Sequence, residues 1–234
     1  MNRGRKPAAQ SRPGGPLERE ARAALKTASR SVARLERSCV RAVASAAEAV
    51  IACLQGGGTV YFCGNGGSAA DAQHMACELS GRYLLDRPGL AAVALTTNTS
   101  SLTAIGNDYG FDEIFARQLD GMGTPGDMLI AYTTSGASAN VIRAVEAAHA
   151  LGMIVIGFTG ERGRRFAALC DHALVTPDVV TPRVQEGHLV MGHALFELVE
   201  RALFGPASGR ASSGVRRGRR RIPGKQGRRK EKRP

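Results

Sequence analysis

The sequence has 234 residues, 43% of them hydrophobic, which is enough for one α/β domain with a sizeable core. No apolar run reaches the roughly 18 residues of a membrane helix, and the basic, polar first 16 residues lack the apolar centre of a secretory signal, so we expect neither feature. The five cysteines are odd in number, scattered and without a CxxC pair, which predicts reduced thiols in a cytoplasmic protein.

The net charge of +12 is concentrated at the two ends of the chain. Residues 205–234 hold twelve Arg and Lys against one acidic residue, and residues 1–25 hold six against two. Such segments bury too little apolar surface to fold, so we expect disordered basic tails at 1–16 and 205–234. A run such as Arg216–Arg221 would either contact nucleic-acid phosphates without specificity or remain solvated with no partner.

The first folded segment, residues 17–55, is predicted to be helical. It is rich in Ala and Arg, with Leu, Val and Ile recurring every three or four residues, and it ends at Gly56-Gly57-Gly58. The pattern fits one long helix or two shorter ones. Its narrow apolar stripe predicts packing against another helix, of this chain or of a second subunit.

Residues 56–204 alternate between short apolar runs and helical segments, which is typical of a buried, mostly parallel sheet in an α/β domain. The five predicted strands are 59–63, 91–96, 128–133, 154–158 and 172–175. The predicted helices are 69–82, 101–107 with 112–119, 139–151, 164–169 and 184–203. Ligands of such sheets bind at the carboxyl ends of the strands, so the loops there are the first place to look for a site.

Two of these loops have the composition of anion-binding turns. Gly64-Asn65-Gly66-Gly67-Ser68 fits a relaxed dinucleotide fingerprint, but the second strand ends in Thr96-Thr97-Asn98-Thr99, without the acidic residue that a ribose requires. A structural turn is the alternative. Thr133-Thr134-Ser135-Gly136-Ala137-Ser138 gathers four hydroxyls before a helix, which favours a phosphate monoester over a simple helix cap, for which Ser138 alone would suffice.

Two helices carry residues suited to metal binding or proton transfer. His74 and Glu78 lie four residues apart on one helical face, as a metal pair, an acid/base pair or a surface pair would. The last helix carries Gln185, His188 and His193. At about 100° per residue, Gln185 lies about 60° from His188 and about 80° from His193, so spacing does not decide between the two histidines.

Five strings in this order resemble the phosphoheptose isomerase subfamily of sugar-phosphate isomerase (SIS) domain proteins, over about residues 56–203. They are Cys-Gly-Asn-Gly-Gly-Ser at 63–68, His-Met-Ala-Cys-Glu-Leu-Ser-Gly-Arg-Tyr at 74–83, Ala-Ile-Gly-Asn-Asp-Tyr-Gly-Phe at 104–111, Thr-Ser-Gly at 134–136 and Arg-Val-Gln-Glu-Gly-His at 183–188. The resemblance implies a three-layer α/β/α sandwich around a mostly parallel five-stranded sheet, preceded by an N-terminal helix. It also implies a homotetramer.

The resemblance further implies one divalent metal per subunit, usually zinc, bound by His74, Glu78, Gln185 and His193. The choice of His193 rather than His188 as a metal ligand comes from this resemblance and not from helical spacing. The implied contacts of a sugar-phosphate substrate are Asn65, Gly66, Gly67, Ser68, Glu78, Asn107, Asp108, Thr133, Thr134, Ser135, Ser138 and Gln185. Pro182 replaces an Asp that some members carry, and the basic tails lie outside the family pattern.

The implied reaction converts sedoheptulose 7-phosphate into D-glycero-D-manno-heptose 7-phosphate through an enediol, for the synthesis of activated heptose and surface glycans. Glu78 is the candidate base on carbon and His193 the candidate shuttle between the oxygens. Three alternatives stay open. The chain could be a regulator that binds a sugar phosphate without catalysis, a protein that associates with the replication initiator, or an isomerase of a hexose or pentose phosphate.

Overall fold

The computed structural model describes residues 15–206. The predictions for the basic tails therefore lie, except at residues 15, 16, 205 and 206, outside the described residues. The N-terminal segment forms two helices, α1 (Pro16–Ser38) and α2 (Val40–Gln55), which meet at Cys39. Within the described range no single helix has both the length and the apolar composition to cross a membrane. Helices α1 and α2 taken together, as a pair bent by 70°, do meet this criterion of length and composition.

The centre of the domain is a five-stranded sheet in the order β2-β1-β3-β4-β5. Every strand pair between residues 15 and 206 is parallel, so the expected mostly parallel sheet is entirely parallel in this range. The strands are β1 (Val60–Gly64), β2 (Ala92–Ala94), β3 (Met128–Tyr132), β4 (Ile154–Gly160) and β5 (His172–Thr176). The edge strand β2 has only three residues, half the predicted length.

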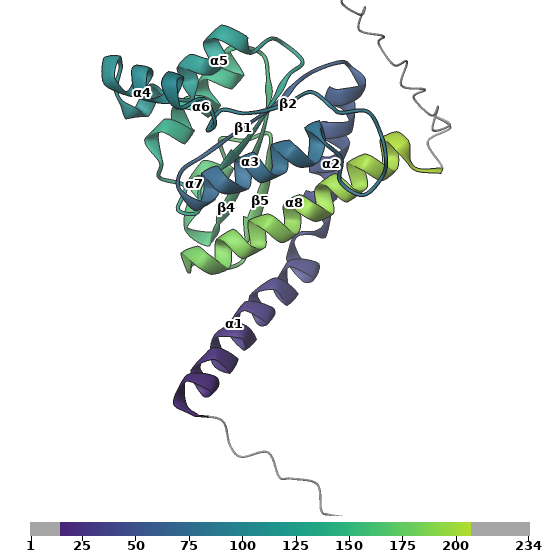
Figure 1. Cartoon of the computed structure of the whole chain (residues 1–234), viewed down its shortest axis with the longest axis vertical. Coiled ribbons are helices and arrows are strands. Elements are labelled where there is room, and N and C mark those ends of the chain that lie inside the picture. Colours follow the sequence, from purple (N-terminus) through teal and green to yellow (C-terminus); the bar gives the residue numbers. More distant parts are fainter. Residues whose placement is uncertain (1–14, 207–234) are drawn as a thin grey trace, which may run out of the picture.

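Helices cover both faces of the sheet, which confirms the three-layer α/β/α architecture (Figure 1). One layer contains α1, α2, α3 (Gly67–Ser80) and α8 (Thr181–Phe204). The opposite layer contains α4 (Thr99–Asp108), the 3-10 turn η1 (Phe111–Glu113), α5 (Ala116–Met122), α6 (Ala139–Ala150) and α7 (Arg164–Ala167), the last preceded by the 3-10 turn η2 (Glu161–Gly163).

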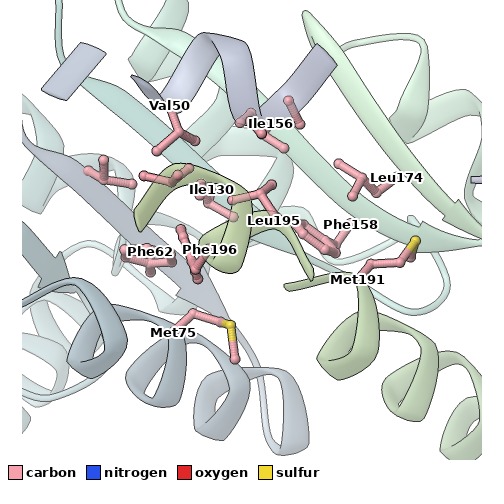
Figure 2. Close-up of a cluster of buried hydrophobic side chains, with 14 of the residues drawn as sticks. Val50, Phe62, Met75, Ile130, Ile156, Phe158, Leu174, Met191, Leu195 and Phe196 are labelled. Atoms are coloured by element: carbon pink, nitrogen blue, oxygen red, sulfur yellow. The ribbon is translucent and has the colours of Figure 1, made fainter. Parts of the chain in front are cut away.

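Successive residues of the central strands point to opposite layers, as the period of a strand requires. Phe62 and Ile130 pack beneath α3 and α8, whereas Tyr61 and Leu129 pack beneath the other layer. Figure 2 shows Phe62, Met75 and Phe196 meeting in the first of these cores. Because both faces of the sheet are buried, the strands appear in the sequence as continuous apolar runs.

Helix α1 is attached to the body only near its C-terminal end. Ser31 and Leu35 are buried there, and Ser31 Oγ donates a 2.8 Å hydrogen bond to Asp178, which also pairs with Arg34. The first half of the helix extends away from the domain (Figure 1), and Leu17 and Leu25 are 79% and 72% exposed. The apolar stripe seen in the sequence therefore continues beyond the part that the domain covers.

Candidate active site

Helices α3 and α8 run side by side in the same direction and bring the candidate residues together. Gly67, at the start of α3, lies against the amide of Gln185, and Met75 lies against Gly192 further along both helices. A Cβ at position 192 would lie 2.7 Å from Sδ of Met75, so the absence of side chains permits this close approach. The contact pairs His74 and Glu78 of α3 with the part of α8 that carries His193.

His74, Glu78 and His193 form a three-residue cluster whose ligand atoms lie within 4.8 Å of one another. His74 Nε2 is 3.1 Å from Glu78 Oε1, and the rings of His74 and His193 meet edge to face with centroids 5.1 Å apart. All three residues are partly buried, so solvent and small ligands can reach them. Two imidazoles and one carboxylate are the donor set of many catalytic zinc sites, so the residues present fit such an ion.

The surroundings of His193 keep its imidazole neutral near pH 7. Partial burial lowers the pKa of His193, the neighbouring His74 lowers it further, and Glu78 opposes the change. The ring of Tyr83 packs against that of His193, with centroids 5.8 Å apart. A neutral imidazole offers a free nitrogen lone pair, which serves equally to bind a metal or to accept a proton.

The turn after β1 supplies the first predicted anion-binding loop. Asn65 and Asn140 exchange two side-chain hydrogen bonds, of 2.7 and 2.9 Å, which tie this turn to the start of α6. Gly66 has a φ of +57°, a conformation that only glycine adopts easily. Ser68 is buried against Gly64 beneath the turn, so of the predicted contacts in this loop it is the least accessible.

The turn after β3 places the hydroxyl-rich loop at the start of α6. Thr133 Oγ1 and Ser138 Oγ are 3.1 Å apart, the amide of Gly136 donates to Thr133 Oγ1, and that of Ala137 donates to Ser135 Oγ. Ser135 is exposed. Ser138 occupies the N-cap position of α6, as the cap alternative expects, but its side chain makes no capping hydrogen bond. The first amides of α6 remain available to an anion.

Asn107 and Asp108 are surface residues of α4. Both are exposed at the end of α4, which belongs to the opposite layer, and the amide of Asn107 donates a 2.8 Å hydrogen bond to its neighbour. The structure therefore joins the two loops to each other and connects the first loop to the His74 cluster through α3, and it leaves Asn107 and Asp108 exposed on the surface. The role of Asn107 and Asp108 stays a prediction.

Comparisons with known proteins identify the family. The sequence model of the SIS domain matches residues 25–160, more than half of the chain. The phosphoheptose isomerase of Rhodospirillum rubrum is 54% identical over 187 residues, which cover 80% of this chain and 99% of that protein. The chain belongs to the SIS family, in its phosphoheptose isomerase branch.

Two solved phosphoheptose isomerases share the fold of this SIS domain. The structure from Neisseria gonorrhoeae is 45% identical, with a TM-score of 0.74, and the match covers 79% of this chain and 98% of that one. The structure from Francisella tularensis is 35% identical, with a TM-score of 0.77, over 80% of this chain and 100% of that one.

The two histidines of α8 occupy different environments in the SIS domain. His188 is fully buried between the rings of Tyr132 and Phe158, and neither of its nitrogens makes a hydrogen bond of normal geometry. Burial lowers the pKa of His188 to about 4, although the backbone of Thr159 favours the charged form. His193, and not His188, lies beside His74 and Glu78.

Three residues near the site were not singled out from the sequence. Asn140 joins the two loops, Tyr83 packs on His193, and Asp71 lies one helical turn before His74. Burial raises the pKa of Asp71 to about 6, and the nearby His74 opposes the rise. Of the three, only Asp71 could have been found from the sequence, because a spacing of three residues on a helix places it on the same face as His74.

We predict that His188 makes the folding stability of the protein depend on pH. The unfolded chain binds a proton at this residue below its ordinary pKa of 6.5, whereas the folded protein binds it only near 4. The free energy of unfolding should therefore fall by up to about 3 kcal/mol between pH 6.5 and pH 4. Urea unfolding across this range measures the effect.

His188→Gln is the matched variant, because it removes this titration and keeps Asp71, whose raised pKa acts in the opposite direction. The variant should show a shallower loss of stability on acidification than the wild type. Identical pH slopes in the two proteins would contradict the assignment of a buried neutral His188.

Proposed function

We propose that the protein converts sedoheptulose 7-phosphate into D-glycero-D-manno-heptose 7-phosphate, which supplies activated heptose for surface glycans. The observation that carries the proposal is the cluster of His74, Glu78 and His193 across α3 and α8, in a chain 54% identical to a phosphoheptose isomerase. An aldose–ketose isomerisation needs a base on carbon, a carrier for the hydroxyl protons and an anchor for the phosphate. The site has a candidate for each.

The phosphate is held by the loop 133–138. Thr134, Ser135 and Ser138 present hydroxyls, and the N-terminal amides of α6 and the helix dipole favour the negative charge. The hydrogen bonds between Asn65 and Asn140 keep the glycine turn at 64–67 next to this loop. Binding energy from the phosphate then orients the far end of the sugar, where the bonds change.

Glu78 and His193 move the protons. The Glu78 carboxylate removes a proton from C1 of the ketose and returns it to C2, through an enediol intermediate. The neutral imidazole of His193 carries the hydroxyl proton from the oxygen on C1 to the oxygen on C2, so the overall reaction is proton-balanced. Tyr83 covers one side of His193 and limits the water around it.

The cluster is also the proposed site of one zinc ion per subunit. His74, Glu78 and His193 have the spacing of metal ligands, and Gln185 is the proposed fourth ligand. A bound zinc would polarise the sugar oxygens. In the present structure the amide of Gln185 rests against Gly67, seven residues before His74 on α3. A Glu bound tightly to a metal is a weaker base, so Glu78 must exchange between the two roles or serve mainly one of them.

A homotetramer in the cytoplasm is the proposed assembly and location. The support for assembly is the apolar stripe of α1. The domain covers this helix at Ser31 and Leu35, but Leu17 and Leu25 of the same helix are exposed. A second helix laid along this stripe would bury it. The nucleic-acid contact considered for the basic tails concerns residues outside the described range and stays a prediction.

The competing interpretation is a sugar-phosphate-binding regulator on the same fold, including one that associates with the replication initiator. Fold alone does not separate an enzyme from a regulator, because function depends on the site. A regulator has no need of a base and a proton carrier, and this chain has both Glu78 and His193 next to each other. An isomerase for a hexose or pentose phosphate would use the same groups, so the choice of substrate is decided by assay.

We predict that Glu78→Gln lowers kcat for sedoheptulose 7-phosphate by about 10²–10⁴-fold, because the amide cannot accept the proton from carbon. The dissociation constant for the substrate should change little, since the phosphate loop is intact. Chromatographic separation of the two heptose phosphates, identified by mass, measures turnover. Glu146→Gln, at an exposed ion pair on α6, is the control and should retain full activity. Near-normal turnover by Glu78→Gln would refute the assignment.

We predict about one zinc per chain in protein purified without chelator, because the donor set fits a four-ligand site. His74→Ala and His193→Ala should lose the metal by elemental analysis and keep the far-ultraviolet circular dichroism of the wild type. His149→Ala, which removes an exposed histidine on α6, should keep it. Metal-free wild type with full activity would exclude a catalytic metal.

We predict that light scattering coupled to size-exclusion chromatography gives a mass four times that of the chain. The double substitution Leu17→Glu and Leu25→Glu should give a smaller species, because like charges would then occupy the stripe of α1. Circular dichroism should remain that of a folded domain, since neither side chain contacts the body. A variant that still forms the full tetramer would place the interface elsewhere.

A further inference from the structure

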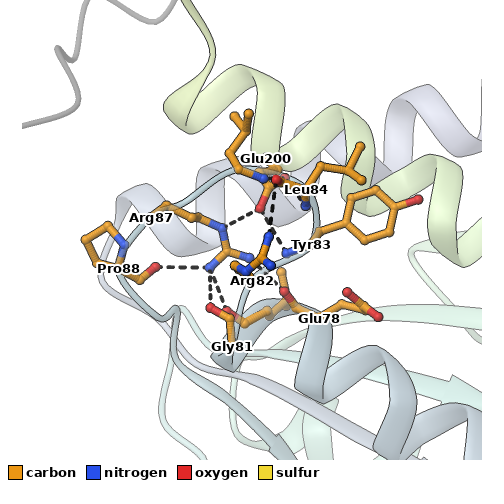
Figure 3. A network of polar contacts seen from close by, with 10 residues as sticks. Glu78, Gly81, Arg82, Tyr83, Leu84, Arg87, Pro88 and Glu200 are labelled. Carbon is orange, nitrogen blue, oxygen red and sulfur yellow. Dashed lines mark hydrogen bonds and ion pairs between the residues drawn. The ribbon is translucent and has the colours of Figure 1, made fainter. Parts of the chain in front are cut away.

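A buried ion pair lies next to the active site, between the loop that follows α3 and the last turns of α8 (Figure 3). Nε of Arg87 is 2.8 Å from Oε1 of Glu200, and the two side chains are only 1% and 3% exposed. Glu200 follows His193 by seven residues, or two turns of α8. Removing two charges from water is costly unless every polar atom is satisfied, so the partners of this pair matter.

Glu200 binds three consecutive backbone amides of the loop. Its Oε1 accepts from the amide of Tyr83 at 3.0 Å, and its Oε2 accepts from Leu84 at 2.7 Å and Leu85 at 2.8 Å. Burial alone would raise the pKa of Glu200, but these amides and Arg87 outweigh it and lower the pKa. The carboxylate is thus charged, and it fixes the loop that carries Tyr83 to α8.

Arg87 binds the other helix. Its Nη2 donates to the carbonyl of Glu78 at 2.7 Å, and its Nη1 donates to the carbonyls of Leu79 at 2.8 Å and Pro88 at 3.0 Å. The first two carbonyls belong to the final turn of α3, where helical carbonyls lack partners within the helix. A guanidinium at this end also complements the helix dipole.

The pair therefore connects α3 to α8, and each of these helices carries some of the reacting groups. Arg87 holds the backbone of Glu78 itself, and Glu200 belongs to the helix of His193. Through the amide of Tyr83, the same network sets the ring that packs on His193. The Arg87 side chain bonds the cluster at the backbone carbonyl of Glu78, and the Glu200 carboxylate bonds the loop and Arg87.

We propose that Arg87 and Glu200 are positioning residues of the isomerase, which set Glu78 relative to His193 and hold Tyr83 against His193. This inference rests on the proposed function of the cluster. A pair that served folding alone would lower stability when altered and leave the reaction of the folded fraction unchanged. A positioning pair would change the reaction and the metal affinity of protein that is still folded.

The test compares Arg87→Lys with the wild type. Lysine keeps the charge beside Glu200 but cannot bond the carbonyls of Glu78 and Leu79 with a planar fork. We expect kcat to fall by about 10-fold or more while KM for sedoheptulose 7-phosphate changes little, because the phosphate loop is untouched. Affinity for Co²⁺, followed by the absorption spectrum of the bound ion, should weaken by about 10–100-fold.

Leu119→Ala, in the core of the opposite layer, is the control for a general loss of stability. It should lower the melting temperature and leave kcat and Co²⁺ affinity unchanged. If Arg87→Lys fails to fold, Arg87→Met with Glu200→Leu removes both buried charges at similar volume, and such replacements are often tolerated. That protein should show the same losses of kcat and metal affinity.

Wild-type kcat and Co²⁺ affinity in a folded variant of the pair would overturn the inference and leave Arg87 and Glu200 with a structural role. Failure of the wild type itself to convert sedoheptulose 7-phosphate would instead refute the proposed function. In that case the Co²⁺ measurement alone decides whether the pair positions His74, Glu78 and His193.

Discussion

The close parallel packing of α3 on α8 is the contact on which the rest of the site depends. It is possible because Gly67 and Gly192 leave room for Gln185 and Met75, each from the facing helix. The contact brings His74 and Glu78 to His193, although more than 100 residues separate them along the chain. A side chain at either glycine would push the helices or their partners apart.

The sheet sets the second constraint, which is the place of the two loops proposed to bind phosphate. Because β1 and β3 are adjacent and parallel, the turns that follow them open at the same edge. The hydrogen bonds between Asn65 and Asn140 then join the turns to each other. The helix that begins at Gly67 continues to His74 and Glu78, so one element links the anion loops to the cluster.

Charge around the site is controlled by burial and by specific partners together. Neither nitrogen of His188 makes a hydrogen bond of normal geometry, and burial keeps this imidazole neutral, whereas Glu200 accepts four hydrogen bonds and is charged, though both are almost completely buried. His193 is only partly buried and lies between an imidazole and a carboxylate, so its proton affinity responds to both. The two histidines of α8 therefore differ in their access to a ligand, because only His193 of the two is partly exposed.

While the three-layer fold followed from the family resemblance, the sequence by itself determined the alternation of strands and helices, the turns at 64–68 and 133–138 and the shared face of His74 and Glu78. These features are local, because periodicity and turn residues fix them within a few positions. Only the tertiary structure decided the break between α1 and α2 at Cys39, the place of His193 beside the cluster, the role of Asn140 and the burial of His188. Each of these depends on the register in which distant helices pack, and spacing along one helix does not contain that register.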